Sequence, residues 1–358
     1  MSNFFSNKFS GLAPYVPGEQ PKGAEYIKLN TNESPFPPSP KAVAAGAKAL
    51  ERLMLYPDPE CSALCKAAAE TFGVRPEQIV CTNGSDEVLS WAFAAFCDGD
   101  RPAVFPDVTY GFYPVFAREN GVPYREVPLK DDLTMDIDAL MAAQGTLVIA
   151  NPNAPTGIAL PRDVIEALLR ADPARMVVVD EAYVDFGGES VVKLIDRYDN
   201  LLVTQTFSKS RSMAGARLGL GFAAEPVIRD LNTLRFSVNP YNVNSVTLAA
   251  GVGALSDPAY TEANCRTIEE NRAFTAAGLA KLGFELTDSK ANFVFACRPG
   301  VSGEALYKAL KAKGILVRHF AKPARIADYL RITIGSRAQM EALLSALAEI
   351  NNEQEINA

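Results

Sequence analysis

A lysine at the end of a predicted buried strand is the first feature of this sequence that could do chemistry. Lys209 comes shortly after the apolar run 201–203, which predicts a strand inside the protein. Two arginines, Arg211 and Arg217, follow the lysine. A partly desolvated amine near cations loses its proton more readily than the amine of a surface lysine. In its neutral form, such an amine can attack an aldehyde and form a Schiff base.

Groups that suit a phosphate surround this lysine. Thr206 and Ser208 carry hydroxyls just before it, and the guanidinium of Arg217 can bind phosphate oxygens as a fork. A ligand with both an aldehyde and a phosphate is pyridoxal 5'-phosphate, so these residues predict a site for that cofactor. On this stretch alone, a surface loop whose polar side chains face water is the alternative.

A second candidate for phosphate binding lies at the start of a predicted helix. Residues 78–85 predict a short strand and a turn, and 86–96 predict an amphipathic helix with acids in its first turn. The free N–H groups of Gly84, Ser85 and Asp86 would then point toward an anion. A turn without a ligand is the alternative.

Three further side chains fit an aromatic ring that carries a nitrogen and a hydroxyl. Asp180 ends the β-branched run 176–179 and could keep a ring nitrogen protonated, which makes the ring an electron sink. The cap of a helix is the alternative role of Asp180. Tyr183 could bond the ring hydroxyl. Tyr110 offers a flat face for stacking, and the alternative for it is a half-buried core tyrosine.

The chain alternates strands and helices over most of its length. Strands are expected at 78–81, 103–105, 124–127, 146–150, 176–179, 201–206 and 218–222. Helices are expected at 41–54, 61–72, 86–96, 111–119, 162–170, 191–198, 226–234 and 258–282. This pattern predicts an α/β fold, a three-layer sandwich with a mostly parallel sheet that binds its ligand at the carboxyl ends of the strands.

Three regions are expected along the chain. Residues 1–40 are rich in proline and form an N-terminal arm, in which Tyr15, Tyr26 and Ile27 favour packing on a surface such as that of another subunit. Residues 41–255 form a large domain that binds the cofactor. Residues 256–358 form a smaller C-terminal α/β domain. In that domain, strands are expected at 292–295, 315–318 and 330–334 and helices at 304–313 and 338–350.

Composition excludes several classes of partner. The net charge of −7 disfavours nucleic acid, whose phosphates require clustered basic residues. No apolar run approaches the ~20 residues of a membrane helix, and residues 1–10 lack the apolar region of a secretory signal. We therefore expect a soluble cytoplasmic protein.

The six cysteines are scattered and are expected to be buried free thiols rather than metal ligands. His319 is the only histidine, so proton transfer falls to Lys, Tyr or a carboxylate unless His319 serves.

Several motifs together resemble one enzyme family. Residues 151–157 (Asn-Pro-Asn-Ala-Pro-Thr-Gly), 180–183 (Asp-Glu-Ala-Tyr), 206–209 (Thr-Phe-Ser-Lys) and 214–219 (Ala-Gly-Ala-Arg-Leu-Gly) resemble the fold-type I pyridoxal-phosphate aminotransferases. Four other stretches look most like the histidinol-phosphate subgroup of that family: 14–21, 29–35, 56–58 and 330–335. The resemblance runs in order from about residue 10 to residue 350.

The resemblance implies roles for individual residues. Lys209 matches the Schiff-base lysine that also moves the substrate proton, Asp180 the partner of the ring nitrogen, and Tyr183 the partner of the ring hydroxyl. The implied phosphate site contains Gly84, Ser85, Ser208 and Arg217, and Tyr110 is the implied stacking residue. Tyr56 matches a tyrosine that reaches the cofactor phosphate of the neighbouring subunit, which implies a homodimer. The implied substrate-binding residues are Arg331, Arg318, Tyr15 and Asn32.

One position departs from the family pattern. Members often have Asn directly before Pro-Thr-Gly, where its side chain contacts the ring hydroxyl, whereas this chain has Ala154. Asn153 is expected to take that role through a shifted turn.

The resemblance implies a transfer of an amino group between small molecules. The implied reaction interconverts histidinol phosphate and imidazole-acetol phosphate, with glutamate and 2-oxoglutarate as the other amino donor and acceptor. Arg331 and Arg318 suit the dianionic phosphate of these substrates. Two alternatives with the same cofactor are an aromatic amino acid aminotransferase and a phosphothreonine-type decarboxylase. A fourth reading is a relative that binds the cofactor only for regulation.

Overall fold

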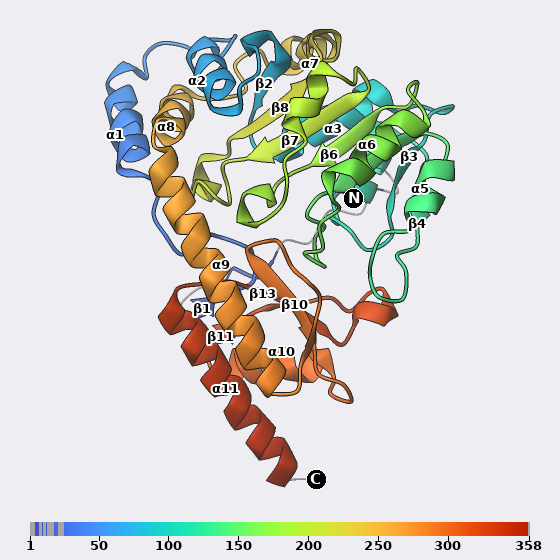
Figure 1. Ribbon diagram of the computed structural model, residues 1–358. Helices are drawn as coiled ribbons and strands as arrows, with labels where there is room; N and C mark the ends of the chain where they lie inside the picture. The colour runs from blue at the N-terminus through green and yellow to red at the C-terminus, as the bar shows by residue number, and fades with distance from the viewer. Residues whose placement is uncertain (1–3, 7–8, 10–11, 13–17, 21–24, 357–358) are drawn as a thin grey trace.

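The protein consists of two bodies that one long helix joins. The computed structural model describes residues 4–6, 9, 12, 18–20 and 25–356. Helix α9 (Pro258–Lys281) runs along the side of the molecule from the larger body to the smaller one (Figure 1). It forms where the sequence predicted a connector at 258–282.

A seven-stranded sheet forms the centre of the larger body, in the order β2-β8-β7-β6-β5-β3-β4. Its strands are β2 (Ile79–Thr82), β3 (Ala103–Pro106), β4 (Tyr124–Val127), β5 (Thr146–Ala150), β6 (Val177–Asp180), β7 (Leu201–Thr206) and β8 (Gly219–Ala223). Only β8 is reversed, because it pairs antiparallel with both β7 and β2. The carboxyl ends of β2, β3, β5, β6 and β7 therefore meet at one edge. The predicted mostly parallel sheet is confirmed.

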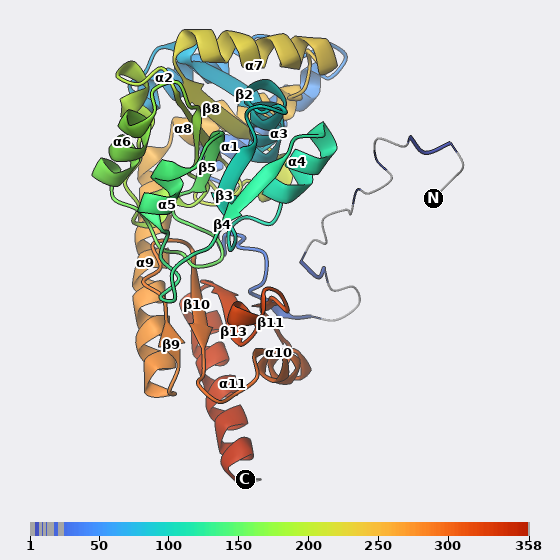
Figure 2. The same ribbon diagram turned by 90° about the vertical axis from the view of Figure 1, so that its right-hand side faces the viewer.

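Both faces of this sheet are covered by helices, because successive strand residues point to opposite sides. Val178 and Leu202 pack with α3 (Ser85–Phe96), α4 (Tyr113–Asn120) and α7 (Glu225–Val238). Val177 and Leu201 pack in the other core, with α2 (Ser62–Phe72), α5 (Ile137–Ala142) and α6 (Arg162–Ala171). Figure 2 shows α3 and α4 on one side of the strands and α5 and α6 on the other. The predicted three-layer sandwich is confirmed.

The smaller body is a four-stranded antiparallel sheet backed by helices. Its strands, in the order β12-β13-β10-β9, are β9 (Glu285–Leu286), β10 (Phe293–Cys297), β12 (Arg318–His319) and β13 (Tyr329–Thr333). Helices α10 (Gly303–Ala312) and α11 (Arg337–Ile356) pack on it together with α9. The expected continuous strand 315–318 is in fact two strands. Its first half, β11 (Ile315–Leu316), pairs in parallel with β1 (Ile27–Lys28), while its second half pairs with β13.

Two helical predictions differ from the structure, and two helices, α5 and α8 (Ser245–Leu255), were not predicted. The helix expected at 41–54 ends at residue 49 as α1 (Pro40–Ala49), and a 3-10 turn follows it. The helix expected at 191–198 is a 3-10 turn, Val192–Asp196. Helix α8 was missed because its sequence is apolar on all sides and shows no helical period. It packs closely on α1, where a Cβ at Gly253 would lie 2.5 Å from the carbonyl oxygen of Lys41.

Within the described part of the chain, no helix has the length and hydropathy needed to cross a membrane.

The segment 29–33 is fixed to the smaller body, although it belongs to the N-terminal region. Thr333 donates its backbone N–H to Leu29 O at 3.0 Å. The hydroxyl of Thr333 donates to Asn32 Oδ1 and accepts from the Asn32 N–H, both at 3.0 Å. The amide of Asn292 donates to Asn32 O at 3.0 Å. These bonds hold Asn32 in a left-handed backbone conformation with φ 56°.

We expect Thr333→Val to destabilise the protein by about 1–3 kcal/mol, because it leaves a buried N–H and a buried amide oxygen of Asn32 without their partner. Thr275→Val is the matched control, since Thr275 is also buried in the smaller body but its hydroxyl donates only to Asn271 O, one turn earlier in α9. Urea unfolding of both variants measures the difference. Equal losses of stability would contradict the anchoring role of Thr333.

Candidate active site

A cavity of about 300 Å³ lies at the carboxyl edge of the large sheet. Its wall contains nine of the residues that the sequence singled out: Ser85, Asp86, Tyr110, Asp180, Tyr183, Thr206, Ser208, Lys209 and Arg217. They come from β6 and β7, from the start of α3, and from the loops after β3, β6 and β7. The edge of the sheet therefore brings together motifs that lie up to 132 residues apart, from Ser85 to Arg217.

Lys209 has an amine that is easy to deprotonate. Its Nζ donates to Thr31 O at 3.2 Å and lies 5.9 Å from the centre of the Tyr183 ring. Burial, and next the positive charge of Arg331, lower the pKa of Lys209 to about 8, and Arg217 makes a smaller contribution. Arg211 was also expected to lower the pKa of Lys209, but it is not among the main causes. Its guanidinium instead pairs with Asp185 at 3.1 Å and lies over the ring of Phe207.

Asp180 is a buried carboxylate with three hydrogen-bond donors. Tyr113 donates to Oδ2 at 3.1 Å, and Thr204 Oγ1 and the Ala182 N–H donate to Oδ1, each at 3.2 Å. Burial raises the pKa of Asp180 to about 6, and these donors act in the opposite direction. The group is thus mostly ionised at neutral pH. A buried anion of this kind favours a cationic N–H partner at its end of the cavity.

The start of α3 and the loop that carries Arg217 give the cavity the features of an anion site. Helix α3 begins after Gly84, which has φ 87° and provides no side-chain cap for the first N–H groups. A Cβ at Gly84 would lie 2.7 Å from Arg217 Nη2, so only glycine lets the guanidinium come this close. Arg217 itself has φ 55°. Its Nη1 reaches Ser208 Oγ at 3.5 Å, and Thr206 Oγ1 lies 3.0 Å from the same hydroxyl.

Asp86 and Tyr110 hold each other at the wall of the cavity. The Tyr110 hydroxyl donates to Asp86 Oδ1 at 2.8 Å, and Arg217 Nη2 lies 3.2 Å from Asp86 Oδ2. The Tyr110 ring packs edge-on against Tyr113, with centroids 5.6 Å apart. These contacts fix the plane of the Tyr110 ring beside the cavity, where it can stack on a flat ligand.

Asn32 bonds Tyr183 instead of lining the cavity. Its Nδ2 donates to the Tyr183 hydroxyl at 2.9 Å, and the Tyr183 ring packs edge-on against Phe293 at 5.1 Å. The segment that carries Asn32 therefore connects the smaller body to a residue of the cavity. Two neighbours of Asn32, Thr31 and Glu33, do line the cavity, and the sequence did not predict this.

Glu33 is a carboxylate that sequence reasoning missed. Lys28 Nζ lies 2.6 Å from Glu33 Oε2, to which Thr31 Oγ1 donates at 2.9 Å. Burial acts to raise the pKa of Glu33, but the hydrogen bonds from Lys28 and Thr31 lower it below its usual value. The polar run Asn-Thr-Asn-Glu-Ser at 30–34, inside the proline-rich arm, was the available signal.

The two predicted substrate arginines lie opposite each other, outside the cavity wall. Arg331 of β13 and Arg318 of β12 are register partners, and both guanidiniums lie over the Phe320 ring, at 5.6 and 5.5 Å. Arg331 also donates to Asn30 O at 3.0 Å. Tyr15 lies outside the described residues.

Asn153 and Tyr56 are not part of this cavity. The Asn153 amide is buried, where it donates to Val108 O at 3.0 Å and accepts from Thr109 Oγ1 at 2.8 Å. Ala154 faces the cavity in its place. Tyr56 is 81% exposed and stacks on Tyr241 at 4.6 Å.

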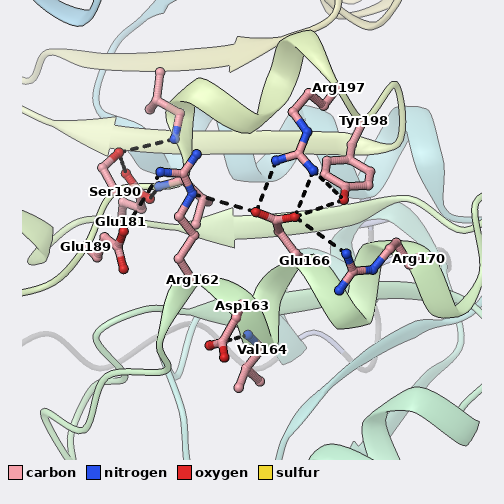
Figure 3. A network of polar contacts seen from close by, with 12 residues as sticks. Arg162, Asp163, Val164, Glu166, Arg170, Glu181, Glu189, Ser190, Arg197 and Tyr198 are labelled. Atoms are coloured by element: carbon pink, nitrogen blue, oxygen red, sulfur yellow. Dashed lines mark hydrogen bonds and ion pairs between the residues drawn. The ribbon is translucent and has the colours of Figure 1, made fainter.

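A polar network outside the cavity supports the loop that follows β6. Glu181 accepts hydrogen bonds from Ser190 Oγ at 2.7 Å, from the Val191 N–H at 2.6 Å and from Gln205 Nε2 at 2.8 Å. Burial raises its pKa to about 7. Figure 3 shows Glu181 and Ser190 beside Glu166, which binds three arginines and Tyr198. Glu181 thus fixes the chain between Asp180 and Tyr183 from outside the cavity.

Comparisons with known proteins agree on one family. The model of "Aminotransferase class I and II" matches residues 24–347. Histidinol-phosphate aminotransferase 1 of Bradyrhizobium diazoefficiens is 50% identical over 98% of this chain and 100% of its own length. Histidinol-phosphate aminotransferase 1 of Pseudomonas aeruginosa is 47% identical over 97% of this chain and 99% of its own length. The crystal structure of histidinol-phosphate aminotransferase from Sinorhizobium meliloti in complex with pyridoxal-5'-phosphate has a TM-score of 0.90 and 25% identity, covering 99% of both chains.

We expect Arg331→Gln to move the titration of Lys209 to higher pH, because the charge of Arg331 is the second cause, after burial, of its lowered pKa. The measurement is the rate at which a small anhydride acylates Lys209 in the ligand-free protein between pH 6 and 11, quantified by mass spectrometry. Arg318→Gln is the matched control, since Arg318 faces Arg331 across the strands but is not among the main charges that act on Lys209. A shift of equal size in both variants would sink this explanation.

Proposed function

Because this chain belongs to the class I and II aminotransferase family, we propose that it is a pyridoxal-phosphate-dependent histidinol-phosphate aminotransferase. The family that the motifs suggested is confirmed. The observation that carries the proposal is one cavity with three groups in its wall: an amine with a pKa of about 8, a buried carboxylate and an anion site. The substrate is supported by relatives of that name at 47–50% identity.

The residues of the cavity fit the cofactor at both of its ends. Asp180 would accept the N–H of the pyridine ring, and the Tyr183 hydroxyl would bond the ring hydroxyl. The start of α3, at Gly84, Ser85 and Asp86, would hold the phosphate, with Arg217 and the hydroxyls of Thr206 and Ser208 around it. Tyr110 would stack on the ring. When bound, pyridoxal phosphate supplies an aldehyde for amines and a ring that stabilises negative charge on the substrate carbon.

Lys209 has two roles in this proposal: its amine is the nucleophile toward the aldehyde, and it also transfers protons. With a pKa of about 8, a useful fraction of Nζ is neutral near neutral pH and can act as nucleophile or as base, while the remainder can return a proton. Thr31 O accepts from Nζ and so directs the amine. Asp180 stays anionic at its end of the cavity, and Asn32 keeps the Tyr183 hydroxyl in place.

Arg331 and Arg318 are proposed to bind the anionic end of the substrate. Two opposed guanidiniums suit the dianionic phosphate of histidinol phosphate and can also bind the distal carboxylate of glutamate. Tyr15 is proposed to join them. Asn32 is proposed to contribute to this pocket through Tyr183, and Asn153 by shaping the turn that presents Ala154 to the cavity.

We also propose that the protein is a cytoplasmic homodimer in which Tyr56 reaches the phosphate site of the neighbouring subunit. The support is a cluster of exposed apolar side chains next to Tyr56: Val43, Leu50, Leu53, Met54 and Leu55. Six free cysteines suit a reducing compartment. The proposed functional division is an arm (1–40), a cofactor domain (41–255) and a small domain (256–358), with residues 27–33 of the arm bound to the small domain.

The expected activity is formation of glutamate from histidinol phosphate and 2-oxoglutarate, read by a coupled assay. Phenylalanine in place of histidinol phosphate should react much more slowly, because it lacks the phosphate that two arginines would bind. Lys209→Ala should lower kcat by at least ~100-fold, the usual minimum for loss of an acid–base group. Lys308→Ala, which removes an exposed lysine paired with Glu304, is the control and should keep full activity. Release of carbon dioxide without glutamate would indicate the decarboxylase instead.

Mixed dimers test the position of Tyr56. We expect Tyr56→Ala to weaken binding of the cofactor, so that activity is lost at limiting pyridoxal phosphate. Co-expression of Tyr56→Ala with Lys209→Ala should then restore roughly a quarter of wild-type activity, because half of the dimers would be mixed and each would have one intact site. No recovery in dimers shown to be mixed would mean that Tyr56 serves its own subunit or none.

A further inference from the structure

Three of the six cysteines meet at one place in the larger body. Cys61 precedes α2, Cys65 lies in its first turns, and Cys81 lies in β2. The Sγ atoms of Cys65 and Cys81 are 3.6 Å apart, and the Cys81 thiol is also hydrogen bonded to Cys61. All three are free thiols with 2–8% of their surface exposed. Two sulfurs of one helix therefore contact one sulfur of the neighbouring strand.

The thiols of Cys61 and Cys81 differ in how easily they lose a proton. The hydrogen bond from Cys81 lowers the pKa of Cys61 most, burial opposes this, and the charge of Arg235 lowers it further. The two neighbouring sulfurs and burial raise the pKa of Cys81 well above its usual range. Since the thiolate is the reactive form, Cys61 is the nucleophile of the group and Cys81 is the thiol that remains protonated beside it.

Small reagents can approach this group from two sides. Cys65 and Cys81 line a hollow that also contains Arg235 of α7. Cys61 lines a second hollow, next to Tyr56. Arg235 donates to Pro59 O and its Nη2 lies 3.9 Å from Glu60, so its positive charge is fixed near the segment that leads into Cys61.

We propose that Cys61, Cys65 and Cys81 form a peroxide-sensitive site in which oxidation produces a disulfide between Cys61 and Cys81. The Cys61 thiolate attacks one oxygen of a hydroperoxide; the O–O bond breaks, the sulfur is oxidised to a sulfenic acid, and the other oxygen leaves as hydroxide or alkoxide. The sulfur of Cys81 then attacks the sulfur of Cys61. The S–S bond forms, the S–O bond breaks, and the leaving oxygen takes the Cys81 proton and departs as water. Cys65 can exchange with this disulfide, because it already contacts Cys81.

The position of this site connects the segment before α3 with the segment of Tyr56, which is proposed to serve the neighbouring subunit. Cys81 is followed by Thr82, whose hydroxyl donates to Gly84 O at 2.9 Å. The carbonyl oxygen of Cys81 accepts a hydrogen bond from Asn242 Nδ2 at 3.2 Å. Cys61 ends the segment that begins with Tyr56. A covalent bond between them would join the two segments. The thiol chemistry itself does not depend on the proposed enzymatic function.

The test is peroxide treatment of the full-length protein with its cofactor bound, followed by thiol counting and peptide mapping. The number of titratable thiols in denaturant should fall from six to four and return to six with dithiothreitol. Cleavage after glutamate separates Cys81 from its two neighbours, because Cys61 and Cys65 lie in peptide 61–70, Cys81 in 78–87, and Cys97 beyond it. The variants below distinguish Cys61 from Cys65. The expected product is a disulfide between peptides 61–70 and 78–87. Its absence after thiols have been lost would overturn the proposal.

Single substitutions of the cysteines show which sulfur is the nucleophile and which is the resolving thiol. Cys81→Ser and Cys61→Ser should each slow the loss of thiols at least ~10-fold, because one removes the resolving thiol and the other the nucleophile. Cys65→Ser should keep the linked peptides 61–70 and 78–87. Cys97→Ser, at a buried thiol outside the group, is the matched control and should match the wild type. Linked peptides in Cys61→Ser formed at the wild-type rate, or thiol loss unchanged in Cys81→Ser, would overturn the assignment. Mapping of the wild-type protein keeps the test decisive even if a variant does not fold.

Discussion

The chemistry of the cavity depends on one constraint: the amine of Lys209 lies where a positive charge is unfavourable. Lys209 sits in a cavity with little water around its amine, and the nearest strong charge acting on it is another cation, Arg331. Both effects favour the neutral amine, which lowers the pKa toward the pH at which the protein works. Arg331 belongs to the smaller body and Lys209 to the larger one. The smaller body therefore contributes, through Arg331, to lowering the pKa of a lysine in the larger body.

The sheet positions the remaining groups through its hydrogen-bond register. Asp180 is the partner of Ala150 on one side and of Thr204 on the other, so its place at the end of β6 is set by two ladders. Thr206 ends β7 two residues beyond Thr204, and Lys209 follows. Reversed strand β8 brings Gly219 so near the start of α3 that a Cβ there would lie 2.4 Å from Ser85 N. This close approach places the loop that carries Arg217 over the N-terminus of α3.

The sequence predicted what is local and missed what depends on distant packing. Motifs at strand ends were identified correctly, because a parallel sheet collects its carboxyl ends at one edge whatever the rest of the chain does. The effect of Arg217 on Lys209 was expected, but that of Arg331 was not foreseen. Arg211 was named beside Arg217 because sequence distance was used in place of spatial distance. Tyr113 was missed because its partner, Asp180, lies 67 residues away. Glu33 was missed because its place at the cavity depends on how segment 29–33 packs on the smaller body. The split at Val317 could not be predicted, because it arises only when Ile27 and Lys28 add a strand.

Asn32 shows how a residue can matter to the cavity without lining it. The turn at 151–157 presents Ala154, which has no polar atom to offer a ring hydroxyl or Tyr183. Asn32 donates to Tyr183 from the opposite side, and its own amide oxygen and backbone are bound to Thr333 and Asn292. Thr333 stands two residues beyond Arg331 on the same strand. A movement of β13 that follows an anion bound at Arg331 would thus be transmitted to the Tyr183 hydroxyl through two hydrogen bonds. In this chain the orientation of Tyr183 is set by the smaller body, which couples the proposed substrate pocket to the proposed cofactor site.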